Sequence, residues 1–161
     1  MPLEYPRLPE LEKQLTELVT VQMLAPIELW LDDHSHLPQL RERSLTQAES
    51  WARRLLCSDE TVAVHAIVQL IAMFYPGDAA FAPQLSWWGT PLGRITAIRF
   101  GHPGAMAVSY TTAGAMLGIS RQGVHDLVKR GKLSLHPDGG VSTMAIRDRL
   151  SAILEFSNHA H

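Results

Sequence analysis

The sequence predicts a mainly α-helical protein, in which an N-terminal helical domain precedes a smaller C-terminal module. The chain has 161 residues and a mass of 17.9 kDa, and 46% of its residues are hydrophobic, which is enough for a core. Apolar residues recur at helical spacing, and capping residues, prolines and glycines stand where helices begin and end. The expected segments are a domain over residues 1–89, a connecting helix and loop over 90–108, and the module over 109–161.

The composition excludes several classes of protein. A single cysteine leaves no partner for an intrachain disulfide and excludes a multi-cysteine zinc site. The chain has no apolar run of about 18 residues, so we expect no transmembrane helix. The first residues, MPLEYPRLPELEKQ, carry acids and prolines where a signal peptide needs basic and then apolar residues. We therefore expect a soluble, cytoplasmic protein.

The N-terminal domain is predicted to begin with a helix after Pro9. Leu11, Leu15 and Leu18 recur there at helical spacing, and Pro26 either kinks this helix or starts the next one. The polar sequence DDHSHLPQ that follows is typical of a loop.

Two further helices complete this domain. Ser44 or Thr46 is the expected cap of the first, and a glutamate three residues after Thr46 would complete a capping box. Ser58 and Asp59 offer the cap of the second, over residues 60–75, where ETVAVHAIVQLIAMFY is apolar on most sides.

The connecting segment, residues 90–108, starts with a strong helix signal. Thr90 is a capping residue, and a proline follows it at the first helical position. Leu92, Ile95 and Ile98 would then face inward, and the sequence GHPG ends the helix.

The C-terminal module contains two short helices joined by a tight turn. Ser109 caps the first helix, and Gly118 supplies a turn residue that tolerates positive φ. Ser120 caps the second helix, over residues 121–130, and Gly131 ends it as a C-cap glycine. Two such helices form a helix-turn-helix, whose second helix enters the major groove of DNA with its N-terminus first.

The spacing of small and apolar residues supports this interpretation. Gly114 lies four residues before the turn glycine, where the two helices cross closely. Val124 and Leu127 lie six and nine residues after that glycine and would lock the second helix onto the first. Ile119 is expected to be a buried plug in the turn.

This segment resembles the excisionase/MerR-like helix-turn-helix family over roughly residues 109–155. The residues that carry the resemblance are Ala113, Gly114, Leu117, Gly118, Ile119, Ser120, Arg121, Val124, Leu127, Arg130, Gly131, Lys132 and Leu133. The resemblance implies a winged helix-turn-helix module. Its two-stranded wing would comprise residues 133–135, a turn over 137–140 and a return from Val141, and Ser142 or Thr143 would cap the last helix.

Two features depart from the family pattern. The family usually has alanine at the position that Gly114 occupies. Its wing tends to carry basic residues, whereas this wing offers only Lys132 at its base and His136 near its tip.

The candidate DNA-binding residues lie on one face of the second helix and beside it. Arginine can bond O6 and N7 of guanine, and glutamine can bond N6 and N7 of adenine, so Arg121 and Gln122 are suited to reading bases. His125 is placed to reach a base or a phosphate, and Lys129 and Arg130 suit backbone phosphates. The full set is Ser120, Arg121, Gln122, His125, Lys129, Arg130, Lys132 and His136. Without the turn pattern, the same face would be read as an ordinary solvated surface.

Charge is distributed unevenly along the chain, although the formal net charge is only -2. Residues 1–93 hold six basic and twelve acidic side chains, whereas residues 94–161 hold eight and four. Only the C-terminal part is therefore suited to lie near phosphates.

The other chemistry-bearing residues receive structural interpretations. Asp32, Asp33, His34 and His36 are interpreted as a polar loop rather than a metal cluster, because no partner with ligand spacing stands elsewhere. Cys57 is interpreted as a small buried hydrophobe rather than a nucleophile. No carboxylate pair, phosphate loop or triad supports catalysis, so we expect neither an enzyme nor a cofactor.

These observations together predict a sequence-specific DNA-binding protein of bacterial or phage type, a transcriptional regulator associated with the nucleoid. One reader helix contacts few base pairs, so specificity needs a second half-site, and we expect a homodimer formed through the N-terminal helices. Three alternatives remain open. They are an architectural factor for recombination or plasmid maintenance, an antitoxin-like protein, and an N-terminal domain that senses a small molecule or acts as an enzyme.

Overall fold

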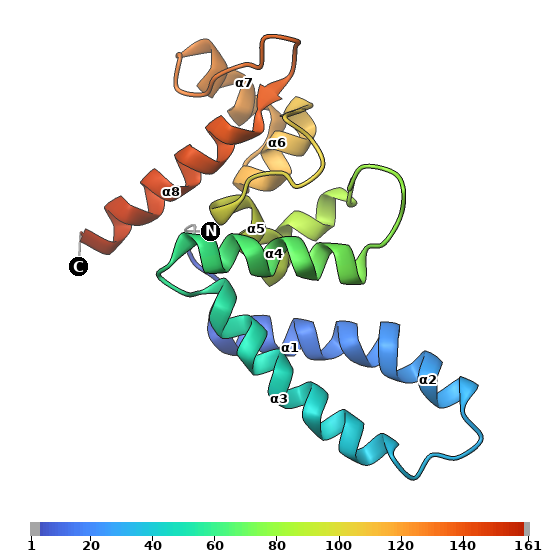
Figure 1. The fold of residues 1–161 in the computed structure, drawn as a ribbon. Helices are drawn as coiled ribbons and strands as arrows, with labels where there is room; N and C mark the ends of the chain where they lie inside the picture. Colours follow the sequence, from blue (N-terminus) through green and yellow to red (C-terminus); the bar gives the residue numbers. More distant parts are fainter. Residues whose placement is uncertain (1–3, 160–161) are drawn as a thin grey trace. The chain divides into compact units, whose positions relative to one another are not determined.

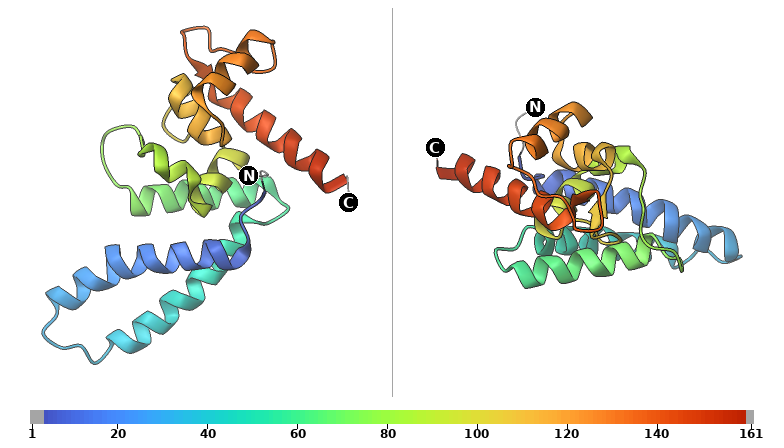
Figure 2. Two further views of the ribbon diagram at one scale, coloured as in Figure 1. Left: turned by 180° about the vertical axis from the view of Figure 1, so that it is seen from behind. Right: turned by 90° about the horizontal axis from the view of Figure 1, so that it is seen from above.

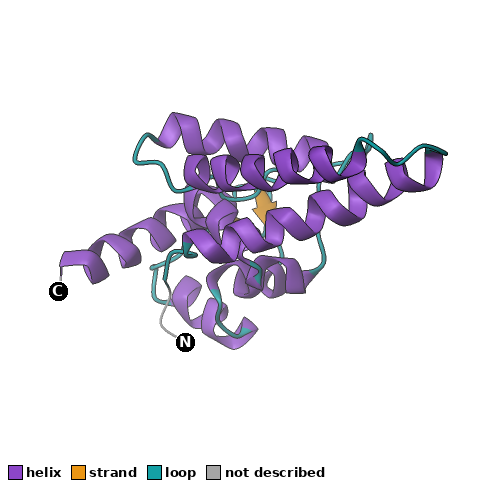
Figure 3. Cartoon of the chain, turned by 90° about the horizontal axis from the view of Figure 1, so that it is seen from below, coloured by secondary structure: helices purple, strands orange, loops and turns teal. Residues whose placement is uncertain are grey.

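The computed structural model describes residues 4–159, with side chains as far as Glu155, and it confirms the prediction of a mainly helical protein (Figures 1 and 3). Along the chain the elements are α1 (Leu8–Val19), η1 (Thr20–Leu24), α2 (Ala25–Trp30), α3 (Leu37–Leu55), α4 (Glu60–Phe74), η2 (Leu85–Gly89), α5 (Pro91–Arg99), β1 (Ala107–Val108), α6 (Tyr110–Leu117), α7 (Arg121–Lys129), β2 (Val141–Ser142) and α8 (Thr143–His159). None of these helices has both the length and the apolar character that a membrane crossing requires.

Contacts divide the chain into two compact units. The N-terminal unit is Arg7–Pro76, and the C-terminal unit is Gly77–His161, with which residues 4–6 also group. The sequence segmentation placed residues 77–108 partly in the N-terminal domain and partly in a connection. In the structure these residues belong to the same unit as the module, because η2 and α5 pack against α6 and α8.

The N-terminal unit is built on a long helical hairpin. The helix α1 begins one residue before Pro9, which occupies its first turn, and it continues without interruption through the π turn of η1 into α2. The N–H of Ala25 donates to the carbonyl of Thr20, five residues earlier rather than four. The hydrogen-bonded turn is therefore one residue longer just before Pro26. After a loop, α3 returns beside α1, as the view from behind shows (Figure 2).

The expected start of α3 is wrong. This helix begins at Leu37 with Pro38 in its first turn, so Ser44 and Thr46 lie inside it rather than at its cap. Their hydroxyls donate to the carbonyls four residues earlier, at 2.8 Å for Ser44 and 3.2 Å for Thr46. A serine or threonine satisfied in this way is compatible with a helix interior, which the capping-box pattern alone does not reveal.

The third helix of this unit, α4, starts where the sequence predicts. The carboxylate of Asp59 accepts a hydrogen bond from the N–H of Thr61 at 2.9 Å and caps the helix. The buried face of α4 carries Ile67, Leu70 and Phe74.

In the C-terminal unit, α5 is buried on nearly all sides. Thr90 caps it by accepting from the N–H of Gly93 at 3.1 Å, and Leu92, Ile95 and Ile98 are buried as predicted. Trp87 and Trp88 pack edge to face at 4.9 Å between ring centroids, directly before this helix.

An aromatic cluster surrounds these two tryptophans. Phe81 stacks edge-on against Trp87 at 5.1 Å, and the ring of His102 lies 5.2 Å from Trp88. Burial in this cluster lowers the pKa of His102 below its usual range, because desolvation disfavours the charged imidazolium. The cluster lies directly before α5, and α6 and α8 pack against this helix.

The small sheet differs from the expected wing. The ladder joins β2 to β1, with Val108 opposite Val141, although β1 comes from the segment expected to be a connecting loop. The expected strand over residues 133–135 is reduced to an isolated bridge between Leu135 and Val141. Val141 pairs with Val108 of β1, and its side chain is fully buried in this register. Burial of this side chain favours the pairing of β2 with β1.

The last helix closes the core of this unit. Ile146, Leu150 and Leu154 are buried on the face of α8 that packs against α5 and α6. Ser142 caps the helix by accepting from the N–H of Ala145 at 3.3 Å. The hydroxyl of Thr143 is instead buried and donates to the carbonyls of Ala105 and Met106.

Candidate nucleic-acid interface

The site is centred on α6 and α7 and on the turn that joins them. Ser109 caps α6 by accepting from the N–H of Thr112 at 3.1 Å. Gly118 ends α6 with φ of 70°, a left-handed conformation that glycine adopts without strain. The N–H of Ile119 then donates to the carbonyl of Gly114 at 2.9 Å, so the turn folds back onto the helix it leaves.

The close approach at Gly114 fixes the geometry of this turn. A Cβ atom at this position would lie 2.7 Å from the carbonyl oxygen of Ile119, which is shorter than real contacts allow. The absent side chain therefore lets the turn backbone rest directly on α6.

The helix α7 is held by caps at both ends and by one deeply buried side chain. Ser120 accepts from the N–H of Gly123 at 3.0 Å at its start. At its end Gly131 has φ of 70°, and the N–H of Lys132 donates to the carbonyl of Leu127 at 2.9 Å. Val124 is fully buried between these ends, whereas Leu127 is half-buried.

The expectation that Ile119 is a buried plug is wrong. Its side chain is 40% exposed. The backbone of Ile119, rather than its side chain, makes the contact with α6 at Gly114. The side chain lies against the first turn of α7, where its Cδ1 would be 3.5 Å from a Cβ atom at Gly123.

The polar residues predicted to contact DNA lie mostly on the exposed side of this unit. The exposed members of the set are Ser120, Arg121, Gln122, His125, Lys129, Arg130 and Lys132. The side chains of its four cationic members form no ion pair or hydrogen bond with any described residue. These cations therefore remain available for an anionic partner.

His125 is oriented by a neighbour on the preceding helix. Its ring meets the ring of Tyr110 edge to face, with the centroids 5.8 Å apart. Because Tyr110 is the first residue of α6, this contact links the two helices on their polar side.

Sequence reasoning missed one acidic residue on this face. Asp126 is exposed and accepts a hydrogen bond from the amide of Gln122 at 3.2 Å. The spacing of four residues on a helix was the available signal. The contact holds the amide of Gln122 in one orientation and places a negative charge among the cations.

The hairpin after α7 contributes less than the family pattern implies. The turn over residues 137–140 forms, with positive φ at Gly139 and Gly140. The side chain of His136 is only 20% exposed, and its Nδ1 accepts from the N–H of Asp138 at 3.1 Å. His136 therefore stabilises the turn itself, and Lys132 is the exposed cation at the base of this hairpin.

The polar loop before α3 is held by local hydrogen bonds. The Nε2 atom of His34 lies 2.9 Å from the carbonyl of Glu28 and 2.8 Å from that of Leu31. The N–H of Ser35 donates to Asp33, and this bond lowers the pKa of the Asp33 carboxyl. Within the described residues, no group of three or more histidine, cysteine or acidic side chains is arranged to hold a metal ion.

No protein-family model, curated protein or solved structure matches this chain.

Proposed function

We propose that this chain is a sequence-specific DNA-binding protein, a transcriptional regulator whose C-terminal unit is a winged helix-turn-helix module. In this proposal α7 enters the major groove with its N-terminus first. Arg121 and Gln122 read base edges, while Lys129 and Arg130 contact phosphates.

The observation that carries the proposal is the two-sided character of α7. Val124 locks one side into the unit, while Arg121, Lys129 and Arg130 project from the other without an ionic partner in the described chain. The C-terminal unit also carries eight basic against six acidic side chains, in contrast to six against ten in the N-terminal unit. Cations at both ends of this exposed face support the proposal, because binding to duplex DNA depends on neutralising its phosphates.

The direct test is binding of the full chain to duplex DNA. We expect selection from a random-sequence duplex pool to enrich a short common motif. We also expect the affinity for that motif to fall with salt, with a log–log slope of about -0.9 for each phosphate contacted. Failure to enrich any motif, or binding that does not change with salt, would contradict the proposal.

Replacing Asp126 with asparagine should strengthen DNA binding. The change removes a negative charge from the exposed face of α7 and keeps an oxygen that Gln122 can bond. We expect the affinity for any duplex to rise several-fold at low salt, with a smaller gain at high salt where charges are screened. Fluorescence anisotropy with a labelled duplex measures this gain.

The matched control is Glu17→Gln, which makes the same change in net charge on an exposed position of α1. If both variants gain equally, the effect is one of net charge and α7 is not the DNA-contacting face.

We also propose that the chain acts as a homodimer formed through the N-terminal helices. Val21, Leu29 and Trp30 are 69%, 89% and 87% exposed, and they belong to the adjoining elements η1 and α2. Large apolar side chains this exposed are typical of surfaces that a partner covers.

Replacing Trp30 with serine should weaken self-association by at least about tenfold, because a buried tryptophan is among the strongest interface contacts. Sedimentation equilibrium measures the change. The control is Met106→Ser, which removes an apolar side chain that is 72% exposed in the other unit. A parent protein that is monomeric, or a Met106 variant that dissociates equally, would contradict this part of the proposal.

A further inference from the structure

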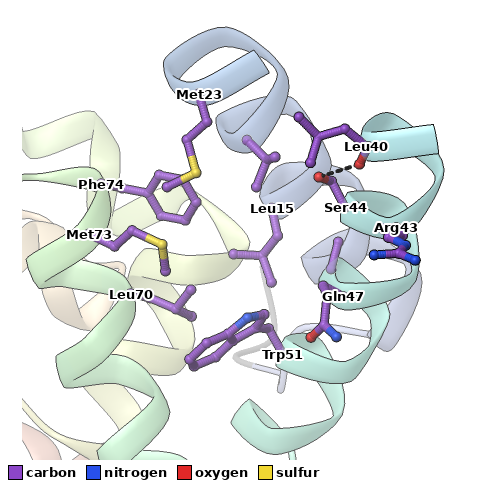
Figure 4. A pocket seen from close by; sticks show the side chains of 12 residues that line it. Leu15, Met23, Leu40, Arg43, Ser44, Gln47, Trp51, Leu70, Met73 and Phe74 are labelled. Atoms are coloured by element: carbon purple, nitrogen blue, oxygen red, sulfur yellow. Dashed lines mark hydrogen bonds between the residues drawn. The ribbon is translucent and has the colours of Figure 1, made fainter. Parts of the chain in front are cut away.

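A cavity of about 280 Å³ lies within the N-terminal unit, where α1, η1, α3 and α4 meet. Figure 4 shows its walls: Leu15 comes from α1, Met23 from η1, Trp51 from α3 and Phe74 from α4. Leu15 is buried, whereas Arg43, Gln47 and Met73 are exposed and mark the side that opens to solvent.

The size and lining of the cavity indicate which part of a small molecule would fill it. At about 30 Å³ for each water of liquid volume, the space suits on the order of ten non-hydrogen atoms. The indole of Trp51 and the ring of Phe74 offer broad apolar surfaces, and the thioethers of Met23 and Met73 adapt their shape to what they contact. The part of the ligand inside the cavity is therefore expected to be apolar, because water there would find few hydrogen-bonding partners.

The polar groups of the cavity lie along one helix. Arg43 and Gln47 are one helical turn apart on α3, and neither side chain has a hydrogen bond or ion pair with a described residue. Ser44, between them, already donates its hydroxyl to the carbonyl of Leu40. The guanidinium of Arg43 has no partner among the described residues, although the unit is acidic overall, and a guanidinium binds a carboxylate through two parallel hydrogen bonds.

We propose that this cavity binds a small organic carboxylate, with an apolar chain or ring inside and its charged group held by Arg43 and Gln47. The site is separate from the DNA-contacting residues, and its test contains no DNA. Failure of this inference therefore leaves the proposed function unaffected, and the converse also holds.

The experiment compares octanoate with octanamide, which has the same shape without the charge, by calorimetric titration of the full chain. We expect octanoate to bind at least about tenfold more tightly than octanamide, because a charge-assisted hydrogen bond contributes more than a neutral one. Arg43→Gln should reduce octanoate affinity to the level of octanamide and leave octanamide unchanged. The control is Arg41→Gln, an arginine of α3 that does not line the cavity and instead lies 3.9 Å from Glu28.

A second variant tests the cavity itself. Met73→Trp adds bulk at an exposed lining position, where the fold tolerates change, and should weaken both molecules. Absence of binding by either molecule, equal binding of the two, or an Arg43 variant that binds octanoate like the parent would each overturn the inference. Loss of binding in the Arg41 variant would overturn the role assigned to Arg43.

Discussion

Replacing Arg121 with alanine should cost roughly 1–3 kcal/mol of DNA-binding free energy and relax the preference at one base pair. Arg121 is the first residue of α7, directly after the Ser120 cap, and its guanidinium has no partner within the described chain. A helix that enters the groove with its N-terminus first brings this residue closest to the base edges. Its loss therefore removes a base contact together with a positive charge.

Lys129→Ala provides the matched comparison, because it removes the same charge two turns further along the same helix. We expect it to weaken all sequences about equally and to reduce the magnitude of the salt slope by about one phosphate contact, with no change in base preference. Competition binding against a panel of single-base variants of the selected motif measures both effects. If the two variants are indistinguishable from the parent, this face of α7 is not the reader.

The sequence predicts best where a local hydrogen bond determines the structure. The caps at Asp59, Thr90, Ser109 and Ser120 form as expected, because each depends on a side chain and an N–H two or three residues away. The mainly helical class follows from the same local signals. The start of α3 fails for a related reason, since Ser44 and Thr46 can cap a helix or lie within it, and local sequence does not distinguish the two.

The predictions that fail depend on contacts between distant parts of the chain. The strand β2 pairs with β1, more than thirty residues earlier, and nothing in the two-residue sequence of β1 indicates that partner. Residues 77–108 likewise join the C-terminal unit through packing of η2 and α5 on α6 and α8. Neither the periodicity of a helix nor its caps specify which element covers it.

The candidate interface shows the same division. The exposed cations of α7 follow from helical periodicity and were predictable. The contact between Gln122 and Asp126 was available from spacing, but the spacing does not show that the carboxylate bonds the amide rather than a cation. The sequence could not predict that the side chain of His136 is mostly buried and accepts from the N–H of Asp138, because a histidine in a hairpin can equally point to solvent.

Gly114→Ala should destabilise the C-terminal unit, although alanine is the better helix former. Alanine is also usual at this position in the family that this segment resembles. Alanine in place of glycine favours a helix by up to about 1 kcal/mol. Against this, the new Cβ would lie 2.7 Å from the carbonyl oxygen of Ile119, which is backbone and cannot rotate away. Relieving such a contact costs about 1–3 kcal/mol, so we expect a net loss of stability and a melting temperature lower by several degrees.

Gly123→Ala is the matched control, because it makes the same substitution in the adjacent helix. Its Cβ would meet Ser120 Oγ at 3.4 Å and the side chain of Ile119 at 3.5 Å, which are ordinary contacts. We expect this variant to be as stable as the parent or more stable, by up to about 1 kcal/mol, in thermal unfolding followed by circular dichroism. If Gly114→Ala melts at or above the parent temperature, the turn backbone does not rest on α6. Because this turn leads directly into α7, the same result would also count against the proposed entry of α7 into the groove.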